Sequence, residues 1–324
     1  MSFNRFILEE QYKKVKGLGD RLELMKHQID WRPFVPLVKS VFHDNKETGG
    51  RPHTDELVVV RSMLLQGWYN LSDQELEFQC YDRLSFRNFL GFPEKIPDFT
   101  TIWKIRDRLE ETGIDTFIMA ELQKQLDEKG LKVEKGMIQD AAFIEADLGK
   151  KRYRKEKNAK KKGETITYTE KQRQHMDKDG SFSVKHGQVH YGYKSHIKMD
   201  IDHHLVRDIT VTTASVHDSK IDLATPQDVI YRDRGYTGKE TKAKGNGSMK
   251  RGNLTPHEKL RNKRISKKRA PGERPFSVVK RVFHGERTQV KTLGRVRVKE
   301  TFKYFAYDLY QLVTLERKRL AVAR

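Results

Sequence analysis

Three acidic residues stand where a carboxylate could take part in chemistry. Asp140 interrupts the apolar run MIQDAAFI, Asp233 closes the short apolar run DVIYRD, and Glu273 lies in the first turn of an expected helix. Each acid alone would more often be an ordinary surface or strand-end residue. Together they suit Mg²⁺ (or Mn²⁺), because hard cations prefer oxygen ligands and two such ions can assist phosphoryl transfer without a protein nucleophile. We therefore expect Asp140, Asp233 and Glu273 to be both the catalytic residues and the metal ligands.

Basic side chains accompany these acids. Lys280 lies seven residues after Glu273, which places the two within about 20° of each other on one helix face. Arg269, Arg274 and Lys280 are expected to hold phosphates or to neutralise developing charge. Lys194 lies in HYGYKSH, where aromatic and basic residues suit a base or phosphate contact. Half-buried strand residues are an equally good interpretation of that segment.

The charge of the chain points to a polyanionic partner. The 324 residues include 65 Lys and Arg against 45 Asp and Glu, a formal net charge of +20, and such a field favours nucleic acid. An apolar share of 36% still supports a packed core. A stretch at about 149–185 is strongly basic, and we expect a surface loop in which Lys160, Lys161 and Lys162 contact phosphates. The alternative role for this loop is solubility.

The expected elements change in kind near residue 130. Before it, helical periodicity and capping signals predict several short helices, with caps at Thr54, at Ser72 and at Asp98 or Thr100, and a stop at Gly113. After it, MIQDAAFIEAD predicts a strand, YKSHIKMDID and LVRDITVTTA predict a hairpin, and DVIYRD predicts a further strand. Residues 239–270 are expected to be irregular, and helices are expected from about Pro271 and over YFAYDLYQLVTLERKRL. We divide the chain into a helical domain, 1–130, and an α/β domain, 131–324.

The sequence argues against a disulfide, a zinc site and a membrane span. The single cysteine, Cys80, allows no internal disulfide and no cysteine-based zinc site, and we expect it to be buried on a helix face. The apolar runs LVVV and MLL are too short to span a bilayer, and the first residues lack a signal-peptide pattern. The histidines between His186 and His217 match no strong zinc motif, so most are expected to be structural or to contact phosphate. A cytoplasmic protein without membrane contact is the consistent interpretation.

Five blocks of the sequence resemble DDE transposases of prokaryotic insertion sequences, in the insertion-sequence-5 branch. They are GRPHTDELVVVRSMLLQGWYNLSDQELEFQCYDRLSFRNFLGFPEKIPDFTTIWKIRDRL, DAAFIEA, HYGYKSHIKMD with VTTASVHDS, DRGYTG, and an R-x3-E-x6-K pattern. The resemblance implies a ribonuclease H-like mixed sheet preceded by an all-helical DNA-binding domain. It assigns the catalytic acids to Asp140, Asp233 and Glu273, and the basic neighbours of the third acid to Arg269 and Lys280.

Two departures from the family pattern bear on the third acid. Pro271 and Gly272 separate Arg269 from Glu273, so Arg269 is expected to precede the helix. A rival register reads VVKRVF as the family's VERVF and would place Lys280 at the position of the acid. We favour Glu273, because E-R-x-F followed by Lys280 matches without gaps. The stretch between SVHDS and DVIYRD also leaves little room for the helix expected there.

The resemblance implies an enzyme that binds the terminal inverted repeats of an insertion sequence. It would cleave the DNA at the element ends and join the freed 3′-OH to target DNA, as a homodimer working on paired ends and associated with the nucleoid. Two rivals remain open at this point. One is a metal-dependent nuclease on the same fold, and the other is a decayed, non-catalytic DNA-binding protein.

Overall fold

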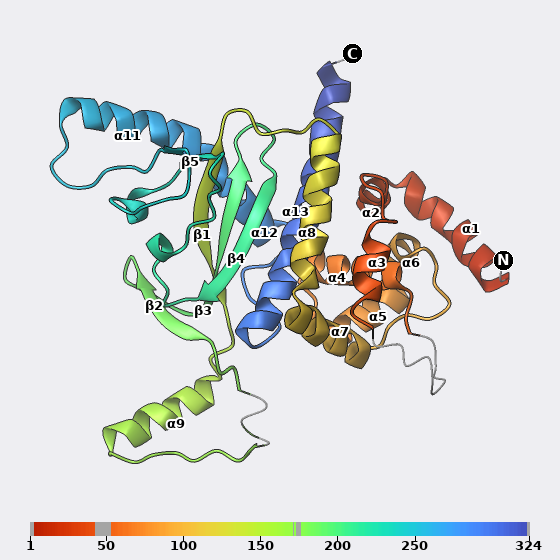
Figure 1. The fold of residues 1–324 in the computed structure, drawn as a ribbon. Coiled ribbons are helices and arrows are strands. Elements are labelled where there is room, and N and C mark those ends of the chain that lie inside the picture. The colour runs from red at the N-terminus through yellow and green to blue at the C-terminus, as the bar shows by residue number, and fades with distance from the viewer. Residues whose placement is uncertain (1–2, 43–52, 171, 173–175, 323–324) are drawn as a thin grey trace.

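A mixed sheet and a set of helices lie side by side along one long C-terminal helix (Figure 1). The computed structural model describes residues 3–42, 53–170, 172 and 176–322. The helices of the first part are α1 Phe3–Gly17, α2 Arg21–Lys26, α3 Phe34–Lys39, α4 Glu56–Tyr69, α5 Asp73–Asp82, α6 Leu84–Leu90, α7 Phe99–Thr112 and α8 Ile114–Glu128. The all-helical character expected for this part of the chain is confirmed.

The helix ends follow the local capping chemistry. Ser72 and Asp98 cap α5 and α7 as expected, by accepting hydrogen bonds from the backbone N–H groups of Glu75 (3.2 Å) and Thr101 (2.6 Å). Gly113 ends α7 in the left-handed conformation. The expected cap at Thr54 is wrong by one residue, because the Asp55 carboxylate accepts from Val58 N at 3.0 Å and α4 begins after it.

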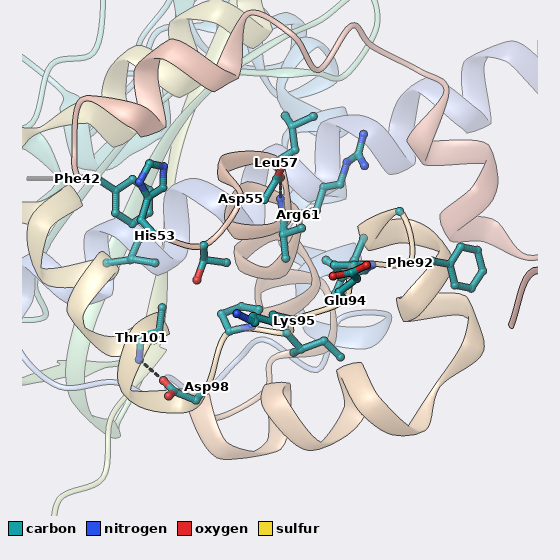
Figure 2. Close-up of a pocket in the computed structure, with 18 of the residues that line it drawn as sticks. Phe42, His53, Asp55, Leu57, Arg61, Phe92, Glu94, Lys95, Asp98 and Thr101 are labelled. Carbon is teal, nitrogen blue, oxygen red and sulfur yellow. Dashed lines mark hydrogen bonds between the residues drawn. The ribbon is translucent and has the colours of Figure 1, made fainter. Parts of the chain in front are cut away.

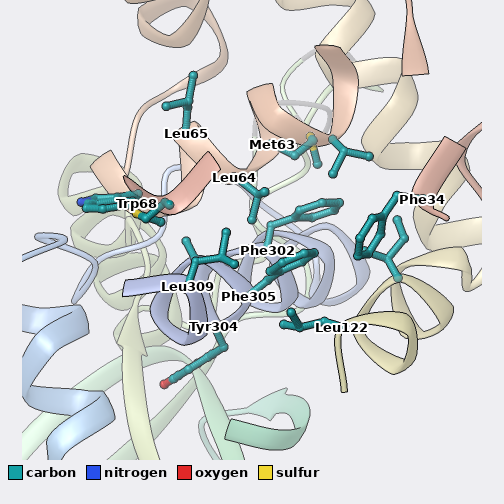
Figure 3. Close-up of a cluster of buried hydrophobic side chains, with 14 of the residues drawn as sticks. Phe34, Met63, Leu64, Leu65, Trp68, Leu122, Phe302, Tyr304, Phe305 and Leu309 are labelled. Carbon is teal, nitrogen blue, oxygen red and sulfur yellow. The ribbon is translucent and has the colours of Figure 1, made fainter. Parts of the chain in front are cut away.

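The largest hydrophobic core is built around α13, Leu293–Val322. Figure 3 shows Phe302, Phe305 and Leu309 of this helix among apolar side chains of α3, α4 and α8. Helix α4 lies so close to α13 that a Cβ on Gly67 would collide with the backbone of Lys303. Ile197, Leu205 and Val206 from the sheet side belong to the same core. The expected closing helix is present and begins about ten residues earlier than YFAYDLYQ indicates. The division of the chain at residue 130 stays a prediction, since this core has members on both sides of it.

The sheet has the order β2-β3-β1-β5-β6, and β4 also pairs with β3. Its strands are β1 Met137–Glu145, β2 Ser181–Lys185, β3 Gln188–Asp200, β4 Val206–Thr213, β5 Val229–Tyr231 and β6 Gly245–Asn246. The β3–β4 hairpin and the strands β1 and β5 confirm the expected elements. β1 is antiparallel to β3 and parallel to β5, so the sheet is mixed, as expected.

Three short one-turn helices and two further helices connect the strands and lead to α13. They are η1 Asp218–Lys220, η2 Arg234–Tyr236, α11 Pro256–Arg269, η3 Ala270–Gly272 and α12 Glu273–Arg281. Between β4 and β5 the only helical turn is η1, in agreement with the short sequence there. The sequence interval 239–270, expected to be irregular, contains β6 and α11, and that expectation is wrong. The missed signal is TPHE: Thr255 and Glu258 form a complete capping box with proline at the first turn.

The basic stretch at 149–185 is also not simply a loop. It contains α9, Lys150–Lys161, and the strand β2. Lysine, arginine and alanine have high intrinsic helix propensity, and a polar composition alone does not prevent a surface helix. In Figure 1 α9 projects from the end of the sheet, well away from the α1–α8 helices.

Candidate active site

Asp140 lies in the middle of β1, next to two other strands. Its backbone pairs with Ile197 of β3, and the side chain is about one-quarter exposed. One carboxylate oxygen accepts a hydrogen bond from Ala141 N at 2.9 Å, and the other accepts from the Arg269 guanidinium at 2.8 Å. Burial raises the pKa of Asp140, Arg269 and the Ala141 amide oppose that rise, and the nearby carboxylate of Asp233 adds to it.

Asp233 follows β5 and caps the one-turn helix η2. Its Oδ1 accepts a hydrogen bond from Gly235 N at 2.7 Å. The parallel register pairs Met137 with Ile230 and Ile138 with Tyr231, and continuing it by two residues sets Asp140 beside Asp233. The effect of Asp233 on the pKa of Asp140 agrees with that neighbourhood. Two of the three expected acids are therefore close together, because the parallel register of β1 and β5 sets the middle of β1 beside the residue that follows β5.

A third carboxylate close to this pair is Asp218. It stands at the start of η1, and its Oδ1 lies 2.9 Å from the Lys194 ammonium. Asp218, Asp140 and Asp233 all raise the pKa of the Tyr236 hydroxyl, although burial of the ring is the largest cause. The sequence offered Asp218 only as one possible extra acid, and it gave no sign of Tyr236, which the buried Gln139 contacts at 3.4 Å.

Glu273 occupies the first position of α12 and is exposed. The helix is held against the sheet by Gly272, where a Cβ would lie 2.8 Å from the Ile138 side chain of β1. Within the described ranges, no three His, Cys, Asp or Glu side chains are grouped closely enough to hold a metal ion. The structure thus brings Asp140 and Asp233 together and leaves Glu273 outside a ready-made three-ligand cluster.

The expected phosphate ligands near the third acid have different surroundings. Arg269 is the last residue of α11 and precedes α12, as expected, and it contacts Asp140. Arg274 donates two hydrogen bonds to Gln311 of α13, at 3.1 and 3.0 Å. Lys280, on the exposed side of α12, forms an ion pair with Glu286.

Lys194 is largely buried in β3. Its ammonium donates to Val216 O at 2.8 Å, pairs with Asp218, and lies 5.0 Å from the centroid of the Phe143 ring. The imidazole of His190, also in β3, stacks on the same Phe143 ring of β1, and the two ring centroids are 4.0 Å apart. The basic and aromatic character read from HYGYKSH is therefore gathered around one ring of β1.

The three lysines expected to contact phosphates in the basic stretch lie at the end of α9. Lys160 and Lys161 lie in the last turn of α9, and Lys162 is its C-terminal cap. All three side chains are exposed, which leaves them accessible to a polyanion.

The histidine-rich segment contains structural side chains. His196 is fully buried and its Nε2 lies 2.9 Å from the Thr212 hydroxyl, and burial lowers its pKa to about 4. His190 Nδ1 lies 2.6 Å from Glu145. Both contacts agree with the structural role that we expected for most of these histidines. Cys80 is buried, also as expected.

The comparison with known families identifies the class of this enzyme. Residues 9–108 match the model of a transposase domain (DUF772), and residues 165–309 match that of a transposase DDE domain. No solved structure matches the chain. The protein is a DDE transposase of insertion sequences, with an RNase H-like catalytic fold. Asp233 and Glu273 lie inside the DDE match, whereas β1 with Asp140 precedes it. The assignment to the insertion-sequence-5 branch stays a prediction.

DDE transposases act on DNA and use divalent metal ions. The donor chemistry here suits such an ion, because Asp140 and Asp233 offer carboxylate oxygens from neighbouring strands. Across the part of the chain that the structure describes, no helix is both long and apolar enough to cross a membrane.

Proposed function

We propose that this transposase binds the terminal inverted repeats of its insertion sequence, cleaves the DNA ends and joins the freed 3′-OH to target DNA. The observation that carries the proposal is the pair of carboxylates on two neighbouring parallel strands, Asp140 within β1 and Asp233 just after β5, with a basic side chain already in contact with Asp140. Charge clustered in this way suits a phosphodiester that reacts at a metal centre. In cells, such a protein would act on nucleoid DNA in the cytoplasm.

Asp140, Asp233 and Glu273 would hold the metal, and the ions would be two Mg²⁺ (or Mn²⁺). A bound divalent cation would supply positive charge beside the reacting phosphate. Asp140 lies within β1 and Asp233 follows β5, whereas Glu273 starts a helix that rests on β1 through Gly272. A rotation of the α12 N-terminus would have to bring the third carboxylate toward the other two.

The basic residues would bind and orient the DNA. Arg269 is positioned to move from the Asp140 carboxylate to a phosphate oxygen once the carboxylate has another cation beside it. Lys280 lies on the exposed side of α12. Lys194 would act through Asp218, keeping that acid charged and fixed. Arg274, which contacts Gln311, would keep α12 docked on α13 and face a phosphate with its remaining N–H groups.

The reaction would proceed in two in-line steps, the first at a phosphodiester of the element end and the second at a phosphodiester of the target DNA. Water attacks the phosphorus at the element end, and the 3′ oxygen leaves with a proton to give a free 3′-OH. That 3′-OH then attacks a phosphorus of target DNA, so one P–O bond forms as another breaks. We propose that a homodimer holds the two element ends for this purpose.

A strand-transfer assay with pre-cleaved ends tests the proposal. In Mg²⁺ or Mn²⁺, the purified protein is expected to join labelled, pre-cleaved inverted-repeat ends to plasmid DNA. A metal-dependent nuclease on the same fold would cut the uncleaved end but yield no joined product. A decayed copy would shift the labelled end in a gel without cutting it. Either result would replace the proposed reaction.

A further inference from the structure

A second site of interest lies in the α1–α8 helices, away from the catalytic acids. A cavity of about 1020 Å³ opens between α4, α7 and the segment 91–98. Figure 2 shows Asp55, the cap of α4, with Leu57 and Arg61 of that helix on one side of it, and Phe92, Glu94 and Lys95 on the other. This cavity is large for a structural defect and falls in the size range of ligand sites.

Arg61 is the unusual residue of this cavity. Its side chain is 9% exposed, and within the described part of the chain it makes no hydrogen bond or ion pair. The guanidinium lies 4.9 Å from the centroid of the Trp31 ring, and its Nη1 would be 3.7 Å from a Cβ on Gly91. Burial lowers the pKa of Arg61, and the charge of Asp55 opposes this effect.

A buried cation with no anionic partner costs free energy. Cation–π contact with Trp31 offsets part of that cost, but it leaves the buried Nε–H of the guanidinium without an acceptor. Five donors in a planar fork match the oxygens of a phosphate group. A bound anion would therefore explain why a buried arginine lies in this open cavity, because the anion would compensate the charge of Arg61.

Three further basic side chains line the cavity. Lys95 and Lys104 are exposed and Arg108 is half-buried, and none of their side chains bonds to a described residue. Two of the three acids of the lining accept hydrogen bonds from backbone N–H groups, and the third, Glu94, is exposed. Asp55 caps α4 and Asp98 caps α7 through backbone N–H groups. The N-terminal ends of both helices also face the cavity, and their dipoles add positive potential.

We propose that this cavity is a phosphate-binding site in which Arg61 is the buried anchor and Lys95, Lys104 and Arg108 form the rim. The phosphate belongs either to the backbone of bound DNA or to a free phosphate compound, since the recognising chemistry is the same. The DNA source rests on the proposed function of the chain. The site itself requires neither catalysis nor a metal ion.

Thermal unfolding in inorganic phosphate tests the site directly. At matched ionic strength, 50 mM sodium phosphate is expected to raise the Tm of the wild-type protein by about 2–4 °C over sodium chloride, because a ligand that binds only the folded state stabilises it. Arg61→Gln should lose most of this shift. Arg83→Gln is the matched control, because Arg83 also lies over aromatic rings but is exposed and outside the cavity. An equal phosphate shift in Arg61→Gln and in the wild type would overturn the site.

A second variant keeps the proposal testable if Arg61→Gln does not fold. The double change Lys95→Gln with Lys104→Gln alters only exposed side chains and should weaken the phosphate affinity about tenfold or less, measured from the concentration dependence of Tm. The Trp31 fluorescence, close to the guanidinium, should change on titration with phosphate. If the double variant binds phosphate like the wild type, the rim does not belong to the site and the proposal fails.

Duplex DNA separates the two sources of the phosphate. If the ligand is the DNA backbone, a 20-base-pair duplex should compete with inorganic phosphate, and Arg61→Gln should reduce the log–log salt slope of DNA binding by about 0.9. If the salt slope is unchanged while the phosphate shift is lost, a free phosphate compound is the ligand. Absence of strand transfer would contradict the proposed reaction and would leave the phosphate-dependent Tm shift in place.

Discussion

The Arg269 guanidinium lies 2.8 Å from the Asp140 carboxylate, so the last residue of α11 is an internal counter-ion for the acid at the centre of β1. Arg269 also opposes the rise in the pKa of Asp140 that burial causes. A divalent cation bound at Asp140 would meet the positive charge of this guanidinium. The ion pair and metal binding should therefore compete.

Replacing Arg269 with Gln should strengthen binding of Mn²⁺ to the DNA-free protein by about 3–10-fold at pH 8, because a like charge near the ion is removed. Mn²⁺ binding measured by electron paramagnetic resonance would test this. Arg274→Gln is the control, since Arg274 contacts the neutral Gln311 rather than a carboxylate. Unchanged or weaker binding in the Arg269 variant would show that the guanidinium does not compete with the metal.

Replacing Asp233 with Asn should separate cleavage from binding. The variant is expected to retain binding of the inverted-repeat end and to lose cutting in Mg²⁺, because a hard cation needs the carboxylate charge. It should also melt slightly higher in metal-free buffer, since the charge of Asp233 disfavours ionised Asp140. A gel shift and a cleavage assay on one labelled end measure both effects.

Wild-type cutting by Asp233→Asn would remove Asp233 from the active site. Loss of end binding together with cutting would indicate a structural role, in which the residue serves chiefly as the cap of η2. Ser72→Ala is a useful control, because it removes a different helix cap and should leave cleavage unaffected.

The basic end of α9 should contribute to DNA affinity through salt-dependent contacts. Replacing Lys160, Lys161 and Lys162 with Ala is expected to reduce the log–log salt slope by up to about 2.7, since each neutralised phosphate contributes about 0.9 for duplex DNA. Preference for the inverted repeat over random duplex should persist. Lys124→Ala on α8 is a control, because the Lys124 side chain is also exposed. An unchanged slope in the triple variant would show that α9 does not touch DNA.

The sequence predicted best where periodicity and chemistry agree. β1 was expected because MIQDAAFI is apolar around one acid, and the β3–β4 hairpin was expected from two β-rich runs around a polar turn. The neighbourhood of Asp140 and Asp233 follows from strand order, which the sequence alone cannot provide; here the family resemblance supplied it.

The misses have identifiable physical causes. Helix α11 is so basic that its composition suggested irregular structure, although Thr255 and Glu258 form a capping box. Helix α9 was missed for the same reason. The ion pair of Lys194 with Asp218 joins residues from β3 and η1, and pairings of that kind depend on tertiary contacts rather than on spacing. Arg61 carried no signal at all, because an arginine within an apolar helix is usually paired.

The buried Asp308 of α13 should make the stability of the protein decrease as pH rises. Its Oδ1 accepts a hydrogen bond from Val206 N at 2.8 Å, and Oδ2 has no hydrogen-bond partner among the described residues. Burial raises the pKa of Asp308 well above its usual range, while Arg207 opposes and Asp200 adds to that rise. A carboxyl whose folded pKa is raised stabilises the fold fully below its unfolded pKa of about 3.9, and this contribution is lost as pH rises through the folded pKa.

Asp308→Asn should therefore show a smaller fall in the free energy of unfolding between pH 5 and pH 8 than the wild type. The difference in slope should approach about 1.4 kcal/mol per pH unit over the part of this range that lies between the two pKa values. Urea unfolding at several pH values measures it, and comparing slopes avoids the separate cost of burying the Asn amide group. Other acids whose pKa burial raises, including Asp115 and Asp208, remain in both proteins, so their contributions cancel in the comparison. Asp82→Asn, at an exposed position of α5, should keep the wild-type slope. Parallel curves for Asp308→Asn and the wild type would show that Asp308 is ionised in the folded protein throughout this range.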